Sequence, residues 1–436
     1  MFTVDFQNTL IAKYPTWLEL EAFLSSEAGG HFRIVGSGRY RVIRYEKKST
    51  DMKSPLVNWM RSTIWDTEAN LPVCVSPTKA KEDDVPPIGS DLPLIQDFMD
   101  GTMINMFVPA FDEATATQPL LNGECDLCEW NQRKLDETVL AKAPPTLATR
   151  SQIGAGGNFY SQRSFAELFT DALVTANTNL VQLALNVRHS FKDVKNVHSY
   201  FASFLLQHPE HRVVSKVDQA RMYLVHTGYV TKDGKTVIED ISELHAEPEL
   251  AALALPQYHM NGFNTVPDYQ SFLNTQLNTK GWFWQGLTFK DVNGNRWRTR
   301  NSKYLILRAL RGSEALPLDR WLRLRSEGKV LEYLKHYAEE RSMFWDFEQR
   351  FRALTLAVYA GYVDVHKAHS KKLTDLPKNV SPCVFRLHAH YLEHLKPQTL
   401  TVKQKDAIDL VNKMTLLEQK RMMTEPRATG AVGAVV

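Results

Sequence analysis

A strongly basic segment carries the clearest chemistry in this sequence. From Arg296 to Lys335 it holds eight arginines and three lysines against four carboxylates, a local charge of +7 in a chain whose net charge is +3. Arg298 and Arg300 are two residues apart, so in a strand both guanidinium groups would face one side and could grip one anion. This composition is typical of proteins that bind phosphate groups, although a solvated helix face would share it.

Five further arginines of this segment are expected to form an exposed positive surface that binds RNA or DNA. They are Arg308, Arg311, Arg320, Arg323 and Arg325. Because contacts to phosphates release counterions, binding at such a surface would weaken steeply as the salt concentration rises.

A pair of cysteines raises the question of a metal site. Cys125 and Cys128 have the Cys-x-x-Cys spacing of zinc ligands. Only Cys74 and Cys383 could complete a thiolate set, and neither belongs to a second pair. A loop with two free thiols is therefore favoured over a zinc site, and we expect no metal. Four cysteines in a chain of this length also indicate no disulfide framework and fit a reducing compartment.

The composition is that of an ordinary soluble globular protein. The chain has 436 residues, of which 43% are apolar and 23% are charged, enough for two or three domains with buried cores. No stretch approaches the roughly 20 consecutive apolar residues of a membrane span. The N-terminal residues lack the basic and apolar regions of a secretory signal. We therefore expect an intracellular location and no membrane partner.

Strand and turn signals dominate the first 300 residues or so. Hairpin turns are predicted at Asp66–Asn70, at Asp233-Gly234 and at Asn293-Gly294, and residues 102–108 have the pattern of a strand. Ser164 and Glu167 predict a capping box at the start of a helix.

After about residue 312 the pattern becomes helical. Five apolar residues repeat at the three- and four-residue spacing of a buried helix face, namely Phe344, Phe347, Phe351, Leu354 and Val358. Further helices are predicted from Ser381 and over Lys403–Arg421. We expect residues 1–312 to form one domain, residues 313–424 to form an all-α domain, and residues 425–436 to be a disordered tail.

Five segments, in this order, resemble the phage-type RNA ligases of the covalent nucleotidyltransferase superfamily. The resemblance is closest to RNA-ligase-like proteins of large DNA viruses of algae and amoebae, and it covers roughly residues 35–312. The segments are residues 61–79, 98–104, 148–154, 204–214 and 284–300. The resemblance implies an α+β fold: a ligase-type nucleotidyltransferase core of antiparallel sheets with flanking helices, followed by the all-α domain.

The central ligase motif, Lys-x-Asp-Gly, is altered in this chain. Asp100 and Gly101 match it, but Phe98 stands where the family has the lysine that attacks the nucleotide α-phosphate. A phenyl ring has no lone pair to donate and cannot form that intermediate. Lys79 and Lys81 are the nearest lysines in sequence that could replace it.

The other segments keep cations and lose carboxylates. The resemblance places Arg61, Lys79 and Arg150 at phosphate or nucleotide positions, and it places Arg298 and Arg300 where the family has two lysines. Arg212 is retained, whereas His211 replaces an asparagine. Leu205 and Gln285 stand where the family has a glutamate that helps to bind ribose or metal and a metal-associated carboxylate. Anion binding should therefore survive, while Mg²⁺ binding and covalent transfer should be weakened.

Three hypotheses for the function follow. The first is a protein that binds a nucleotide, such as ATP or another nucleoside triphosphate, or RNA or DNA, through a cationic cleft without covalent transfer. The second is an active ATP-dependent RNA ligase or adenylyltransferase in which Lys79 or Lys81 replaces the nucleophile. The third is a structural component of a virion or of its assembly, since a fold can outlive its function. The viral resemblance would place the protein in the host cytoplasm, the virus factory or the virion.

Overall fold

The computed structural model describes residues 2–82, 94–110, 144–240, 250, 253, 254, 256, 258, 259, 265–291 and 293–424. Two compact units divide the chain, Met1–Arg308 (unit 1) and Ala309–Val436 (unit 2). Unit 1 is a mixed α+β structure and unit 2 is helical in its described part, as the sequence predicted. The Cys125/Cys128 pair and the expected disordered tail both lie outside the described residues. None of the described helices is long and apolar enough to cross a membrane.

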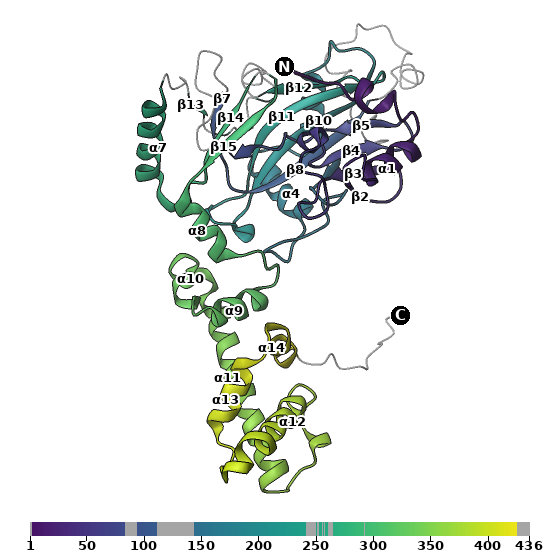
Figure 1. Cartoon of the computed structure of the whole chain (residues 1–436). Helices are drawn as coiled ribbons and strands as arrows, with labels where there is room; N and C mark the ends of the chain where they lie inside the picture. Colours follow the sequence, from purple (N-terminus) through teal and green to yellow (C-terminus); the bar gives the residue numbers. More distant parts are fainter. Residues whose placement is uncertain are drawn as a thin grey trace, which may run out of the picture. The chain divides into compact units, whose positions relative to one another are not determined.

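Unit 1 contains three sheets, the largest of which has six strands (Figure 1). Every neighbouring pair of this first sheet is antiparallel. Its strands, in spatial order, are β1 (Phe2–Val4), β12 (Thr236–Asp240), β11 (Arg221–Thr231), β10 (Val197–Gln207), β8 (Thr102–Pro109) and β9 (Thr146–Ala148).

The second and third sheets have five and four strands. The second sheet consists of β13 (Tyr258–His259), β7 (Leu94–Asp97), β14 (Gly286–Lys290), β15 (Arg296–Arg300) and β6 (Lys81–Glu82), and only its β15–β6 pair is parallel. The third sheet consists of β2 (Arg33–Val35), β3 (Tyr40–Arg44), β4 (Thr63–Asp66) and β5 (Leu71–Cys74). The hairpins β4–β5, β11–β12 and β14–β15 confirm the turns predicted from the sequence.

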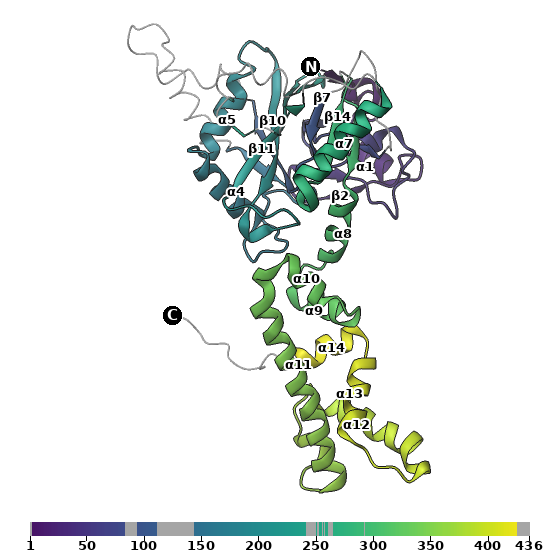
Figure 2. The ribbon, with the colours of Figure 1, turned by 90° about the vertical axis from the view of Figure 1, so that its left-hand side faces the viewer.

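Helices cover the outer faces of the sheets (Figure 2). On the first sheet, α4 (Phe165–Thr175) packs against β10 and β11, and α5 (Leu180–His189) packs against β10 and β8. The predicted capping box is present at the start of α4, where Ser164 and Glu167 hydrogen-bond each other's backbone N–H. On the second sheet, α7 (Val266–Lys280) buries Tyr269 against Leu287 and Phe289. The apolar side chains of β14 therefore face α7, which leaves the alternate residues for its opposite face. Helix α1 (Trp17–Ser25) precedes β2, and α8 (Ser302–Arg311) follows β15 along the chain.

Unit 2 is built around one long helix, α11 (Arg341–Tyr362). Of the predicted stripe, Phe344, Phe351 and Val358 are buried. The other helices of the described part are α9 (Pro317–Ser326), α10 (Val330–His336), α12 (Ser381–His390), α13 (Gln404–Lys413) and α14 (Leu416–Met423). The prediction of a single helix over Lys403–Arg421 was wrong. The segment forms two helices, α13 and α14, with a break that ends at Thr415. There the side chain of Thr415 accepts a hydrogen bond from the backbone N–H of Glu418 and begins a new helix.

A stacked pair of histidines joins α12 to the π-helical turn Val363–Lys367 that follows α11. The ring centroids of His366 and His388 are 3.7 Å apart and their planes differ by 3°. His366 Nε2 and His388 Nδ1 are buried and have no hydrogen-bond partner among the described residues. Burial lowers the pKa of His366 from its ordinary value, and the neighbouring His388 and His369 lower it further.

This pair predicts that the protein loses stability as the pH falls below about 6.5, the pKa of an unfolded-state histidine. The unfolded chain then binds a proton that the folded chain binds less readily, so the free energy of unfolding decreases by up to about 1.4 kcal/mol per pH unit. The variant His366→Phe keeps a flat ring but cannot titrate. Thermal unfolding at pH 7.5 and 5.5, followed by circular dichroism, should show a smaller pH effect in this variant than in the wild type. The exposed His394, changed in the same way, is the control. An unchanged pH effect in His366→Phe would contradict the assignment.

Candidate functional site

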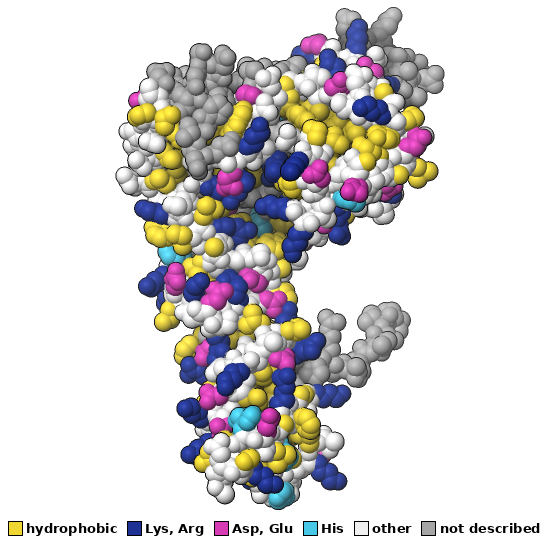
Figure 3. Space-filling view, viewed as in Figure 1, with side chains coloured by type: hydrophobic (Ala, Val, Ile, Leu, Met, Phe, Trp, Pro, Cys, Tyr) yellow, Lys and Arg dark blue, Asp and Glu magenta, His cyan; other side chains and the backbone are white. Residues whose placement is uncertain are grey.

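A cavity of about 610 Å³ lies within unit 1 and is lined from both the first and the second sheet. The first sheet contributes Thr102, Met103, Leu205 and Val225, and the second contributes Gln96, Thr288 and the arginines of β15. Figure 3 shows Lys and Arg side chains gathered around a hollow on the face of this unit. Six of the described lining residues are arginines: Arg61, Arg150, Arg296, Arg298, Arg300 and Arg308.

The structure brings together most of the residues singled out in the sequence. Each of the five ligase-like segments contributes to the lining of this one cavity. The residues that do so are Arg61, Phe98, Asp100, Gly101, Arg150, Leu205, His211, Gln285, Arg298 and Arg300, with Arg308 beside them. Lys79 and Lys81 are not among the described lining residues.

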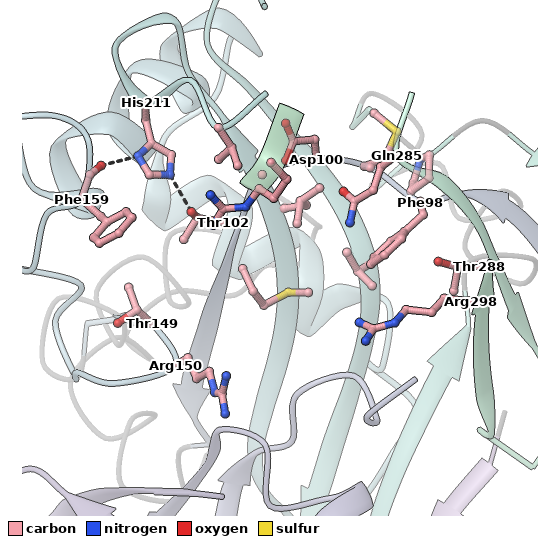
Figure 4. A pocket seen from close by; sticks show the side chains of 18 of the residues that line it. Phe98, Asp100, Thr102, Thr149, Arg150, Phe159, His211, Gln285, Thr288 and Arg298 are labelled. Carbon is pink, nitrogen blue, oxygen red and sulfur yellow. Dashed lines mark hydrogen bonds between the residues drawn. The ribbon is translucent and has the colours of Figure 1, made fainter. Parts of the chain in front are cut away.

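Two of the arginines reach into the cavity from opposite walls (Figure 4). Arg150, in the turn after β9, donates a hydrogen bond from Nη2 to the carbonyl oxygen of Tyr45 at 3.0 Å, and its guanidinium carbon lies 4.6 Å from the centre of the Tyr45 ring. Arg298, on β15, pairs with Glu82 at 3.3 Å. Burial lowers the pKa of Arg61, and the like charges of Arg150 and Arg298 act in the same direction. The described lining therefore carries more positive than negative charge, with six arginines against two carboxylates, Asp97 and Asp100.

Gln96, Thr288 and Arg298 form a row of polar side chains across the second sheet. Gln96 on β7 is the cross-strand neighbour of Thr288 on β14, which in turn is the neighbour of Arg298 on β15. Gln96 and Thr288 are each only 3% exposed, and Gln96 Nε2 and Thr288 Oγ1 have no hydrogen-bond partner among the described residues. Unsatisfied buried polar groups are costly, so this row is a place for a ligand that offers hydrogen-bonding atoms. Neither residue was predicted from the sequence, although their alternation with the buried Ile95, Leu287 and Phe289 is a signal that places them on this face.

Asp100 is engaged in a way that the sequence did not predict. Its Oδ2 accepts hydrogen bonds from the backbone N–H groups of Val214 and Ser215, both at 2.9 Å, and its Oδ1 accepts one from the hydroxyl of Tyr304 at 2.6 Å. A carboxylate with three donors is thus committed to positioning the cavity wall. Gly101 is required for a different reason: a Cβ there would lie 2.5 Å from the carbonyl oxygen of Leu206.

Phe98 occupies the cavity beside Gln285 and Arg298 (Figure 4). Its backbone N–H donates to the carbonyl of Gly286 at 2.9 Å, and its ring centre is 5.9 Å from the guanidinium carbon of Arg298. No lysine is found among the described residues that line the cavity. Lys81 Nζ lies 5.8 Å from the ring centre of Trp297, a residue whose side chain alternates with that of Arg298 along β15.

His211 forms a hydrogen-bonded chain with Thr102 at the cavity wall (Figure 4). Its Nδ1 is 2.5 Å from the carbonyl oxygen of Phe159, which can only accept, so Nδ1 carries the proton. Its Nε2 therefore accepts the hydrogen bond from the hydroxyl of Thr102 at 2.7 Å. The imidazole thus orients a hydroxyl group of the cavity, a role that the sequence did not indicate.

The predicted exposed positive surface was wrong. Arg311 and Arg320 are buried and pair with Glu340. Arg323 pairs with Glu314 and Glu327, and Arg325 pairs with Glu348. Arg308 donates to the hydroxyl of Tyr160 in the cavity wall. Four of the five arginines are therefore paired with carboxylates of unit 2, because the chain places acidic residues on neighbouring helices that the linear charge count does not reveal.

We expect Asp100→Ala to destabilise unit 1 by about 2–4 kcal/mol, because it removes the carboxylate that accepts hydrogen bonds from two backbone N–H groups and from the Tyr304 hydroxyl. Tyr304→Phe removes one of these three bonds and should cost about 1 kcal/mol. Urea unfolding followed by intrinsic fluorescence measures both. If Asp100→Ala costs no more than Tyr304→Phe, the carboxylate does not hold the wall as described.

A scan against protein-family models finds none that matches this chain, and a search of curated proteins finds no significant match. Among the described residues there is no group of three or more histidine, cysteine or carboxylate side chains that could hold a metal ion. The function must therefore be inferred from the side chains that line the cavity.

Proposed function

We propose that the cavity of unit 1 binds the phosphate groups of a nucleotide, or of the end of an RNA or DNA strand, without forming a covalent bond to them. One observation carries the proposal: six of the described lining residues are arginines and none is a lysine. Arginine presents a permanent charge and a planar set of donors that match phosphate oxygens. Because it stays protonated at neutral pH, it cannot act as the amine nucleophile of covalent transfer.

The charge balance of the cavity supports an anionic ligand. Asp97 and Asp100 are the only carboxylates among the described lining residues. Asp97 accepts hydrogen bonds from His259, Lys280 and Trp284. Burial raises the pKa of Asp97, but these bonds outweigh it and leave that pKa below its ordinary value. Arg61 and Arg150 have no carboxylate partner among the described residues, so a bound phosphate would supply the missing countercharge.

The rest of the lining supports a nucleotide in preference to a bare phosphate ion. A volume of about 610 Å³ falls in the range of about 300–1,000 Å³ that is usual for small-molecule sites. Gln96 and Thr288 offer hydrogen bonds that nothing in the described chain uses, and Phe98, Met103 and Leu205 offer an apolar surface for a ring. ATP or another nucleoside triphosphate has both the charge and the planar base that these groups would contact.

The donor set fits a magnesium ion poorly. Mg²⁺ prefers carboxylate oxygens and water, and the oxygens of both Asp97 and Asp100 already accept protein hydrogen bonds. Leu205 and Gln285, which the resemblance places at carboxylate positions, carry no negative charge. The proposed binding therefore relies on arginines and includes no metal.

We further propose that unit 1 is a ligase-type nucleotidyltransferase core whose nucleophile has been lost. Its support is that five segments spread over 240 residues of sequence supply side chains to one cavity between two largely antiparallel sheets. The competing hypothesis, in which Lys79 or Lys81 replaces the nucleophile, has less support, because neither lysine is among the described lining residues of the cavity. A structural role in a virion stays a prediction from the resemblance alone.

The first test is the affinity for ATP, measured by isothermal titration calorimetry at low ionic strength. We expect a dissociation constant in the range of about micromolar to millimolar. Arg298→Gln should weaken binding by about tenfold or more, because a charged hydrogen bond contributes about 1.5–3 kcal/mol. The control is Arg33→Gln, an exposed arginine of the same unit that pairs with Glu46 outside the cavity. Equal affinities in the wild type and Arg298→Gln would count against the proposed site.

The second test is covalent labelling with α-labelled ATP or GTP and a divalent metal, followed by denaturing electrophoresis. No labelled band is expected from the wild type, because Phe98 has no lone pair to attack the α-phosphate. A band that disappears in Lys79→Ala or Lys81→Ala would instead establish a relocated nucleophile. Labelling that appears only in Phe98→Lys would show that residue 98 occupies the nucleophile's position.

A further inference from the structure

Unit 2 contains an open groove of about 1010 Å³ formed by α9, α10 and α11. Its floor includes Trp321 and Phe344, which are almost fully buried. Its edges carry Leu331 and Trp345, whose side chains are 79% and 64% exposed. Large apolar side chains that line a concavity and remain open to water are typical of sites that bind another molecule.

A buried ionic network holds the three helices that form the groove. Glu340, at the start of α11, accepts a hydrogen bond from Arg311 at 2.5 Å and one from the hydroxyl of Tyr333 at 2.9 Å, and Arg320 of α9 lies 3.5 Å away. The rings of Tyr333 and Phe344 stack with centroids 5.3 Å apart. Two arginines that the sequence suggested for nucleic acid therefore fix the groove in place. Such a preformed groove loses little conformational entropy when it binds a partner.

The charges at the groove favour a partner with acidic residues. Lys335 and Arg341 line the groove, are exposed, and have no ion-pair partner among the described residues. Arg325 and Glu348 also line it but pair with each other at 3.6 Å, and the guanidinium of Arg325 lies over the ring of Phe351. The unpaired charge around the apolar centre is thus positive.

We propose that this groove binds an amphipathic helix of a protein partner, with an apolar stripe against Leu331 and Trp345 and with acidic residues beside Lys335 and Arg341. Helices commonly occupy apolar grooves between helices by inserting residues spaced at i, i+3, i+4 and i+7. A nucleic acid fits this groove less well, because two unpaired cations around leucine and tryptophan give few phosphate contacts. A second copy of the chain fits less well too, because a twofold contact would place the two basic grooves against each other.

The test uses the full-length protein and two fluorescent helical peptides of about 18 residues, which is about five helical turns. Both carry leucine at the i, i+3, i+4 and i+7 positions. Their polar positions are glutamate in the acidic peptide and lysine in the basic peptide. Fluorescence anisotropy should show that the acidic peptide binds at least about tenfold more tightly than the basic one. Equal binding of the two peptides, or no binding of either, would overturn the proposal.

Variants connect the binding to the groove. Leu331→Asp should weaken binding of the acidic peptide by about tenfold or more, and Lys335→Glu combined with Arg341→Glu should reverse the preference between the peptides. Leu356→Asp changes an exposed leucine of α11 outside the groove and should leave the affinity unchanged. Circular dichroism spectra and thermal unfolding, which the groove variants should retain, show that each variant is folded.

Two other results would assign the groove to a different partner and overturn the proposal. The first is displacement of the peptide by single-stranded RNA that the doubly charge-reversed variant no longer binds. The second is a concentration-dependent dimer in sedimentation experiments that Leu331→Asp abolishes, which would identify a second copy of the chain as the occupant.

Discussion

The carboxylate of Asp100 joins the elements that enclose the cavity. The chain passes from β7 of the second sheet to β8 of the first sheet through residues 98–101. Within that link, Asp100 accepts hydrogen bonds from Val214 and Ser215, which follow β10, and from Tyr304, which follows β15. One buried carboxylate thus connects both sheets and α8 at one corner of the cavity. Gly101 lets the next strand approach Leu206 closely, so both residues of the Asp-Gly pair have a structural role at this corner.

The second constraint is electrostatic. Keeping several guanidinium groups around one cavity costs free energy, because burial and mutual repulsion both oppose their charges, and these effects lower the pKa values of Arg61 and Arg300. Glu82 offsets part of the repulsion at the edge of β15, where it lies 3.3 Å from Arg298 and 3.2 Å from Arg300. Strained arrangements of this kind are commonly retained at binding sites. A polyphosphate would relieve the repulsion, and this relief is the physical basis of the proposed function.

The features that the sequence predicted correctly depend on residues close together along the chain. They are the Asn-Gly and Asp-Gly hairpins, the Ser164–Glu167 capping box and the buried face of α11. The ordered segments anticipated that Arg61, Asp100, Gly101, Arg298 and Arg300 share the cavity, but the same expectation for Lys79 was wrong. The roles that depend on partners far along the chain could not be predicted. The sequence alone suggested that Arg311 and Arg320 are surface cations, whereas in the fold both are buried and pair with Glu340. Similarly, the Thr102–His211 hydrogen bond joins residues 109 positions apart.

We propose that phosphate groups, recognised by arginines, determine what this cavity binds. The most direct measurement is a calorimetric comparison of ATP, inorganic tripolyphosphate and adenosine with the full-length protein at low and at moderate ionic strength. We expect tripolyphosphate to bind, ATP to bind more tightly and adenosine alone to bind much more weakly, and we expect the affinity for both anions to fall as the salt concentration rises. Adenosine binding as tightly as ATP, with tripolyphosphate failing to bind, would show that the arginines do not select the ligand through its phosphates.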